Sequence, residues 1–166
     1  MIAWAAGFID GEGSIMVIKH KPHNGVSPSY YVRLKVNNTR LEPLLRLKSL
    51  FGGYIIEHKY TVPAKHWKNL FNWVIQGRSA SFCLEQILPY LSIKAQQAKL
   101  GLELEYLKAA KQHQKTVALT DRELKRRELI SQEIKVLNER GKPKRNIQLA
   151  LAPEEEKQVS LSLLLN

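Results

Sequence analysis

The sequence predicts an α+β domain in which helices and pairs of β-strands alternate in the order αββαββα, with additional helices toward the C-terminus. Two stretches rich in β-formers each fall into two halves separated by a polar loop, and each pair follows a helical segment. The second half of the chain instead has helical periodicity. Hydrophobic residues make up 44% of the 166 residues, enough for one buried core.

Residues 1–76 account for the first two helices and all four strands. A short helix ended by glycines opens the chain, and Gly52-Gly53 ends the next helix. The two strand pairs are antiparallel hairpins by their spacing, the first around the polar loop Pro22–Pro28. We predict helices at Ile2–Gly11 and Leu41–Leu50, and strands at Ser14–Lys21, Tyr30–Asn37, Tyr54–Thr61 and Lys68–Gln76.

The remaining residues are predicted to be helical, with helices at Ser79–Leu91, Lys94–Ala110 and Thr120–Leu137. Thr120-Asp-Arg-Glu123 has the spacing of a capping box, which favours a helix start there. A basic loop, Arg140–Arg145, follows. We therefore expect a single domain over residues 1–145 and a tail of unknown role over 146–166.

The chain is basic, with 26 Lys and Arg against 15 Asp and Glu and a formal net charge of +11. Residues 1–100 hold 13 basic and 5 acidic side chains, a net charge of +8, whereas residues 101–166 hold 13 and 10, a net charge of +3. The excess therefore lies with the predicted strands. It favours an anionic partner, of which nucleic acid is the commonest, although a basic surface kept for solubility remains open.

Cys83 is the one cysteine, so the chain cannot form an intramolecular disulfide. This fits a reducing compartment. No apolar stretch approaches the ~18 residues that cross a bilayer, and the N-terminal residues lack the basic start of a signal peptide.

The predicted strand Tyr30–Asn37 alternates between polar and apolar side chains. Val32, Leu34 and Val36 share one side, so Tyr31, Arg33 and Lys35 must share the other. An antiparallel sheet with helices on one face leaves its second face to solvent or to a ligand. A basic open face is suited to DNA, and an ordinary solvated face is the alternative.

Small residues recur every four positions on the first predicted helix, at Ala3, Gly7 and Gly11. This small-residue face would let a second helix backbone approach closely. Trp4 and Phe8 lie on another side and would anchor the helix to its own core. The partner helix could belong to the same chain, but only one such helix exists. We therefore predict a two-fold homodimer whose interface includes Ala3, Ala6, Gly7 and Gly11.

Residues 5–13, Ala-Ala-Gly-Phe-Ile-Asp-Gly-Glu-Gly, resemble the LAGLIDADG motif of homing endonucleases, and Ser14-Ile15 continue the resemblance. The motif occurs once, as in the homodimeric members of that family. The resemblance covers most of residues 1–140. It implies the homing-endonuclease fold and an intron-encoded enzyme that cuts both strands of a long pseudo-palindromic DNA site.

The resemblance also implies an active site. Glu12 takes the place of the motif's final acid and, with the main-chain carbonyl of Gly11, would bind Mg²⁺, for which Mn²⁺ or Ca²⁺ can substitute in binding. Asp10 takes a structural position. The segment Leu91–Ala98 matches a family pattern that makes Lys94 a second catalytic basic residue, which would stabilise charge on the scissile phosphate, and Asn38 and Arg40 would organise the attacking water. The plainer alternatives are an exposed acid for Glu12 and a solvated lysine for Lys94.

In this family DNA is contacted by alternate side chains of the sheet and by a basic loop after the last long helix. Lys19 could also bind a phosphate. The corresponding contacts predicted here are Ser14, Met16, Ile18, His20, Lys21, Tyr31, Arg33, Lys35, Ile56, His58, Lys68, Asn72, Lys142, Lys144 and Arg145.

Two other functions remain open on the sequence alone. The fold is also used by intron RNA splicing maturases, in which cleavage is optional, and by DNA-binding regulators that have lost catalysis. The retained Glu12 favours the endonuclease. The resemblance further implies an organelle matrix, of chloroplast or mitochondrion, or a prokaryotic cytoplasm as the compartment.

Overall fold

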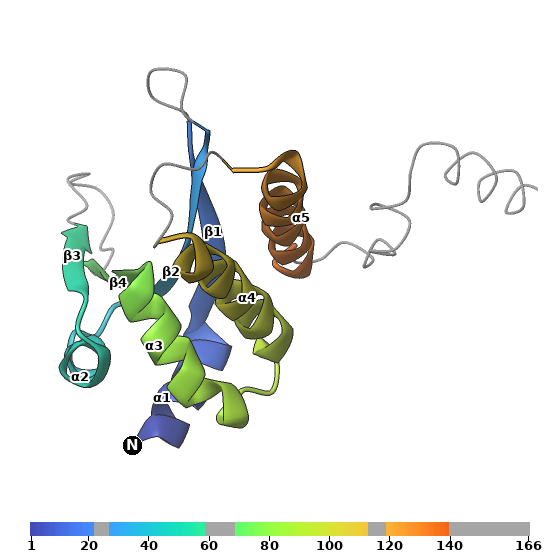
Figure 1. Cartoon of the computed structure of the whole chain (residues 1–166). Coiled ribbons are helices and arrows are strands. Elements are labelled where there is room, and N and C mark those ends of the chain that lie inside the picture. The colour runs from blue at the N-terminus through green and yellow to red at the C-terminus, as the bar shows by residue number, and fades with distance from the viewer. Residues whose placement is uncertain (22–26, 59–68, 113–118, 140–166) are drawn as a thin grey trace, which may run out of the picture.

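The computed structural model describes residues 1–21, 27–58, 69–112 and 119–139. Its elements follow the predicted order (Figure 1). They are α1 (Ile2–Glu12), β1 (Gly13–His20), β2 (Ser29–Asn38), α2 (Glu42–Phe51), β3 (Tyr54–His58), β4 (Leu70–Gln76), α3 (Arg78–Ile87), the 3₁₀ turn η1 (Leu88–Tyr90), α4 (Ala95–Gln112) and α5 (Asp121–Leu137).

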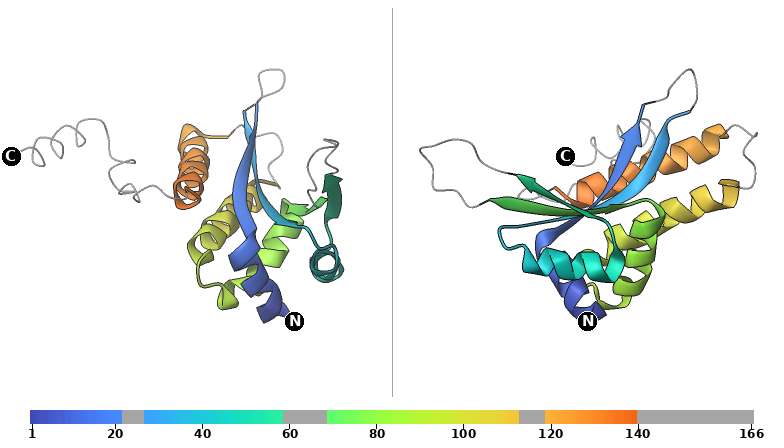
Figure 2. Two further views of the ribbon diagram at one scale, coloured as in Figure 1. Left: turned by 180° about the vertical axis from the view of Figure 1, so that it is seen from behind. Right: turned by 90° about the vertical axis from the view of Figure 1, so that its left-hand side faces the viewer.

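The four strands form one antiparallel sheet in the order β1-β2-β4-β3, so β2 and β4 are central. Helices α3 and α4 pack against one face of this sheet, and α1 runs directly into β1 at its base (Figures 1 and 2). Val32, Leu34 and Val36 are fully buried under these helices. The predicted α+β class and the predicted alternation of β2 are therefore confirmed.

One tight turn, at Gly52-Gly53, positions the second strand pair. Gly52 and Gly53 have φ angles of 76° and 82°, which residues with a side chain rarely adopt. A Cβ on Gly53 would also lie 2.5 Å from the carbonyl oxygen of Val74. The Trp73 indole donates a hydrogen bond of 2.9 Å to the Gly52 carbonyl. The glycine pair that was predicted to end the helix therefore also positions β3 beside β4.

The predicted helix Ser79–Leu91 is too long by its last turn. The α-helix ends at Ile87, and Leu88–Tyr90 form a 3₁₀ turn. Pro89 has no N–H to donate and disfavours helical backbone at the residue before it. The resulting bend brings the chain back toward α1, with which η1 is in contact.

Helix α5 starts at the predicted capping box, in which Thr120 and Glu123 bond each other's backbone N–H. It packs on β1 and α4. Asn138 donates a 2.8 Å hydrogen bond to the carbonyl of Ile15 in the edge strand β1. The α5 residue Glu128 accepts hydrogen bonds of 2.6 Å from both Lys19 and the Tyr30 hydroxyl.

These bonds correct one expectation. Lys19 alternates onto the helix side of β1 and pairs with Glu128, so it does not face the same side as the predicted DNA contacts. Among the described residues, no helix has the length and apolar character needed to cross a membrane. The predicted boundary between residues 145 and 146, and the loop 140–145, lie outside the described residues.

Candidate active site and DNA-binding surface

Helix α1 turns into β1 within one residue, at Gly13. The Gly13 N–H bonds the Ile9 carbonyl, and a Cβ on Gly13 would lie 2.7 Å from that oxygen. Only glycine allows so close an approach, because any side chain would collide with the last turn of the helix. The motif glycine therefore fixes where Gly11 and Glu12 stand relative to the sheet.

Asp10 is 7% exposed and reaches across to the start of α4. Its carboxylate accepts main-chain hydrogen bonds from Ser92 (2.6 Å), Ile93 (3.1 Å) and Lys94 (2.9 Å). These N–H groups belong to the three residues directly before Ala95, the first residue of α4, where the helix N-terminus stabilises a negative charge. Asp10 therefore fixes the segment that leads into α4, which agrees with its predicted structural role.

Lys94 forms the return contact. Its side chain is 7% exposed, and its ammonium donates a hydrogen bond to the main-chain carbonyl of Asp10, two residues before Glu12. The C-terminus of a helix carries partial negative charge, and α1 has no basic residue in its own last turn. Lys94 therefore supplies the positive charge that α1 lacks, at the end of the helix that carries Glu12.

The pKa of Asp10 reflects both effects. Burial alone would raise it, but the three main-chain donors and the charge of Lys94 together lower the pKa below its ordinary value. The carboxylate is thus kept ionised, as its hydrogen bonds require.

The surroundings of Glu12 are the opposite of those of Asp10. Its side chain is exposed and makes no hydrogen bond or ion pair with any described residue. It lies at the negative end of α1, where a carboxylate is unfavourable unless a cation is present. Within the described residues no three Asp, Glu, His or Cys side chains are grouped closely enough to hold a metal ion. At this end of α1 the described residues therefore offer one carboxylate rather than a complete metal site.

Asn38 and Arg40 lie close to this end of the sheet. Gly13 pairs with Val36, so the β1–β2 register places Asn38 beside the end of α1. The Asn38 side-chain oxygen accepts a 2.8 Å hydrogen bond from the Arg40 main-chain N–H, and Arg40 is exposed. The structure thus brings Gly11, Glu12, Lys94 and Asn38 to one corner of the domain, with Arg40 at its rim.

The remaining predicted contacts share the sheet face that α3 and α4 leave uncovered. The strand register pairs Met16 with Arg33, and Ile56 with Asn72, on this side. We call this surface the open face. Its members among the predicted residues are Ser14, Met16, Ile18, His20, Tyr31, Arg33, Lys35, Ile56, His58 and Asn72.

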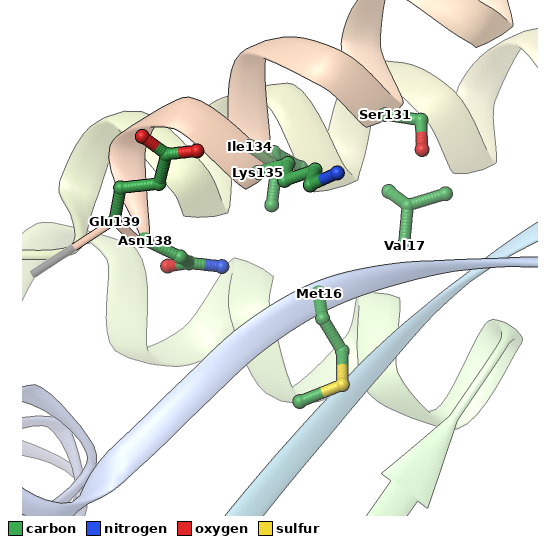
Figure 3. Close-up of a pocket in the computed structure, with 7 residues that line it drawn as sticks. All are labelled: Met16, Val17, Ser131, Ile134, Lys135, Asn138 and Glu139. Carbon is green, nitrogen blue, oxygen red and sulfur yellow. The ribbon is translucent and has the colours of Figure 1, made fainter.

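Figure 3 shows the two sides of β1 directly. Val17 points toward α5, across a groove of about 390 Å³ whose lining also includes Met16, Ser131 and Lys135. The end of the Met16 side chain nevertheless points away from α5. The groove therefore lies on the helix side of β1, and Met16 belongs to the open face.

One predicted contact has different surroundings from those expected. Asn72 is 3% exposed, and its amide nitrogen contacts the His58 ring, so in this conformation it supports His58 instead of presenting its amide to a base. Lys21 is exposed just beyond β1. Lys68, Lys142, Lys144 and Arg145 lie outside the described residues.

The small-residue face of α1 is exposed as predicted, at Ala3, Gly7 and Gly11. A Cβ added at Gly7 or Gly11 would meet nothing within 4 Å, so packing inside the protomer does not require either glycine. Ala6 was wrongly placed in the interface, because it is fully buried in its own core. Ala6 lies three positions after Ala3 and one before Gly7. The helical rotation over that one residue moves its side chain off the exposed face and into the protomer.

The sequence did not lead us to predict Gln76 as a DNA contact. It is exposed on the open face opposite Arg33 and accepts hydrogen bonds from that guanidinium. The alternation of β4 carries the signal, since Gln76 lies four residues after Asn72 and therefore on the same side.

The sequence profile of the LAGLIDADG endonuclease family matches residues 5–92, more than half of the chain. The chain belongs to this family. It is therefore a DNA endonuclease, and the motif helix identified above is α1. A comparison with curated protein sequences gives no match.

Solved structures share the fold. The homing endonuclease I-CvuI in complex with its target in the presence of calcium has a TM-score of 0.63 and 24% identity, over 98% of this chain and 93% of that chain. The archaeal intron-encoded I-Vdi141I complexed with DNA has a TM-score of 0.65 and 18% identity, over 95% and 96%. I-SmaMI bound to uncleaved DNA with calcium has a TM-score of 0.58 and 24% identity, over 90% of this chain but 48% of that chain.

Proposed function

We propose that this endonuclease acts as a homodimer on a long pseudo-palindromic DNA site, with the α1 helices of two protomers packed along their small-residue faces. The supporting observation is the exposed Glu12 at the end of a helix whose Gly7 and Gly11 have open space around them. Two-fold contacts between helices bury the same surface on both protomers. An α1–α1 contact therefore brings the two Glu12 side chains together and places both open faces over one DNA duplex.

The homodimer would also complete a metal site. Two Glu12 carboxylates near one axis repel each other unless cations lie between them. Carboxylate and carbonyl oxygens, here of Glu12 and Gly11, are the ligands that Mg²⁺ and Ca²⁺ take, with DNA phosphates supplying more. A bound divalent cation would supply activation of water and stabilisation of the leaving oxygen. I-CvuI structures were determined with Ca²⁺ and with Mg²⁺.

The surrounding residues would position the DNA backbone. Lys94 and Asp10 hold the end of α1 against α4, so Glu12 stays at a fixed depth relative to the sheet. Arg40 is exposed at the rim and can hold a phosphate oxygen, while Asn38 can orient a water through its amide. Lys94 adds positive charge beneath the phosphate that is cleaved.

The size of the open face sets the length of the target. Strand β2 has 10 residues, which at ~3.3 Å per residue is on the order of ten base pairs of groove. A homodimer would then cover roughly twice that length, long enough to be rare in a genome.

The proposal is tested by selecting cleaved sites from a randomised double-stranded DNA library with Mg²⁺. We expect a target of about 20 base pairs whose halves are related by a two-fold axis at the cut. A cleaved site without that symmetry would contradict the homodimer, and cleavage that continues in the presence of a chelator would contradict the metal site. I-CvuI and I-Vdi141I are useful reference enzymes because both were solved with DNA.

A further inference from the structure

Arg33 occupies the middle of the open face and is held there by neutral groups only. Its Nε and Nη2 donate hydrogen bonds of 3.2 and 3.0 Å to the Gln76 side-chain oxygen on the neighbouring strand. Nη2 also donates a 3.1 Å bond to the Tyr31 hydroxyl. Among the described residues no carboxylate forms an ion pair with Arg33, so its charge is fixed in place but not neutralised.

Tyr31 is itself held from the other side. Its hydroxyl lies 2.9 Å from the Nε2 of His20, and the two rings stack with centroids 5.2 Å apart. The Arg33 guanidinium lies 5.7 Å from the centre of the Tyr31 ring. A continuous chain of contacts therefore crosses three strands, from His20 on β1 through β2 to Gln76 on β4.

We propose that Arg33 reads a guanine in each half-site, and that Tyr31 and Gln76 are positioning residues that hold its guanidinium in the reading orientation. This inference rests on the proposed function, because it assigns one base preference within that DNA target. An arginine carries five N–H donors and no acceptor. Three are engaged by Tyr31 and Gln76, which leaves the Nη1 donors for a ligand.

Guanine is the base that suits such a group. In the major groove it presents two adjacent acceptors, N7 and O6, whereas adenine pairs its acceptor with a donor and cytosine presents a donor. A side chain that is already held in place loses little conformational entropy on binding, which favours directed contact with a base edge. A phosphate contact needs only positive charge and gains little from this arrangement.

Lys35 provides a matched contrast on the same strand. It lies two residues beyond Arg33 on the open face, and its side chain makes no hydrogen bond or ion pair with a described residue. A mobile ammonium on a flexible stem is suited to a phosphate, which reads charge rather than sequence. The two residues therefore have the same charge but different expected roles.

The test compares variants on the selected target and on versions of it in which each base pair is replaced in turn. Arg33→Gln replaces the donor-only guanidinium with an amide, the group that suits adenine, so the preference for guanine at one symmetric pair of positions should fall roughly 5–100-fold. The dependence of binding on salt should stay nearly the same, because a residue that contacts a base neutralises no phosphate. Tyr31→Phe should reduce the preference at the same positions by a smaller factor, because Arg33 remains but loses one of the hydrogen bonds that hold its guanidinium.

Lys35→Ala serves as the contrasting variant. It should weaken binding to all target versions alike and lower the slope of log K against log salt by about 1. Arg122→Ala, an exposed charge on α5, controls for general loss of charge. Melting temperatures establish that each variant is folded before its preference is measured.

Three results would overturn the assignment. Uniform weakening with a lower salt slope in Arg33→Ala, as expected for Lys35→Ala, would make Arg33 a phosphate contact. Full guanine preference in Arg33→Gln would remove its reading role, and unchanged preference in Tyr31→Phe would remove the positioning role. If the wild-type enzyme itself selects no symmetric site, the proposed function fails instead, and that outcome is separate from these three.

Discussion

Asp10 and Glu12 are two acids of one motif, two residues apart on α1, and they have opposite surroundings. Asp10 is 7% exposed and accepts three main-chain hydrogen bonds from the start of α4. Glu12 is exposed and has no partner among the described residues. The helical rotation between them, about 200°, turns one carboxylate into the domain and the other away from it.

This difference shows how one short motif can serve both folding and catalysis. A buried carboxylate needs all of its hydrogen bonds satisfied, so Asp10 is committed to the α1–α4 contact. An unpartnered carboxylate at the negative end of a helix favours a cation, so Glu12 remains available for chemistry. The following predictions separate the two roles, beginning with the largest expected effect.

The largest effect is expected on cleavage. Glu12→Gln removes the charge that would attract the divalent cations, and the rate of DNA cleavage should fall by at least about 10³-fold. Its melting temperature should change little, because the side chain is exposed. Cleavage assays and calorimetry on the same preparation measure both quantities. Glu139→Gln, another exposed acid, is the control and should cut normally. Undiminished cutting by Glu12→Gln would show that the metal ligands lie elsewhere.

The second substitution, Asp10→Asn, should lower stability more than cleavage, the reverse of Glu12→Gln. Asp10→Asn turns a charged acceptor of three N–H groups into a neutral amide, which should lower the free energy of unfolding by about 1–3 kcal/mol. The melting temperature should then fall by roughly 2–10 °C. Below that temperature, cleavage should persist far better than in Glu12→Gln. A variant as stable as the wild type would mean that Asp10 does not join α1 to α4.

The smallest effect concerns acid stability. The folded-state pKa of Asp10 is lowered, so its contribution to stability is complete above its unfolded-state pKa of about 3.9 and is lost as the pH falls through the folded value. The gap in unfolding free energy between wild type and Asp10→Asn should therefore narrow below about pH 4. Denaturant titrations at pH 6 and pH 3 measure this gap. A gap that widens on acidification would contradict the direction assigned to the Asp10 pKa.

Much of this arrangement was predictable from local patterns. The alternation of Val32, Leu34 and Val36 with polar neighbours identified both faces of β2, and the capping box at Thr120 located the start of α5. The motif residues predicted which side chains lie at the end of α1. In each case, residues close in the sequence determine the structure through one helical or strand period.

The features that were missed depend on contacts between distant residues. No local pattern connects Lys19 and Tyr30 with Glu128, which lie about a hundred positions apart and meet only because α5 packs along β1. The burial of Asn72 follows from the strand order, which places β4 between β2 and β3. Ala6 turns inward because only one side of α1 remains open.

The central claim is that two α1 helices meet along their small-residue faces, and a disulfide at Gly7 tests it most directly. A side chain fits there without disturbing the protomer. The native Cys83 is buried with a pKa raised to about 12, so it should not react. Under mild oxidation, Gly7→Cys should form a covalent dimer in high yield, whereas the wild type and Lys125→Cys on α5 should not. A Gly7→Cys protein that stays monomeric while it still cuts DNA would contradict the account.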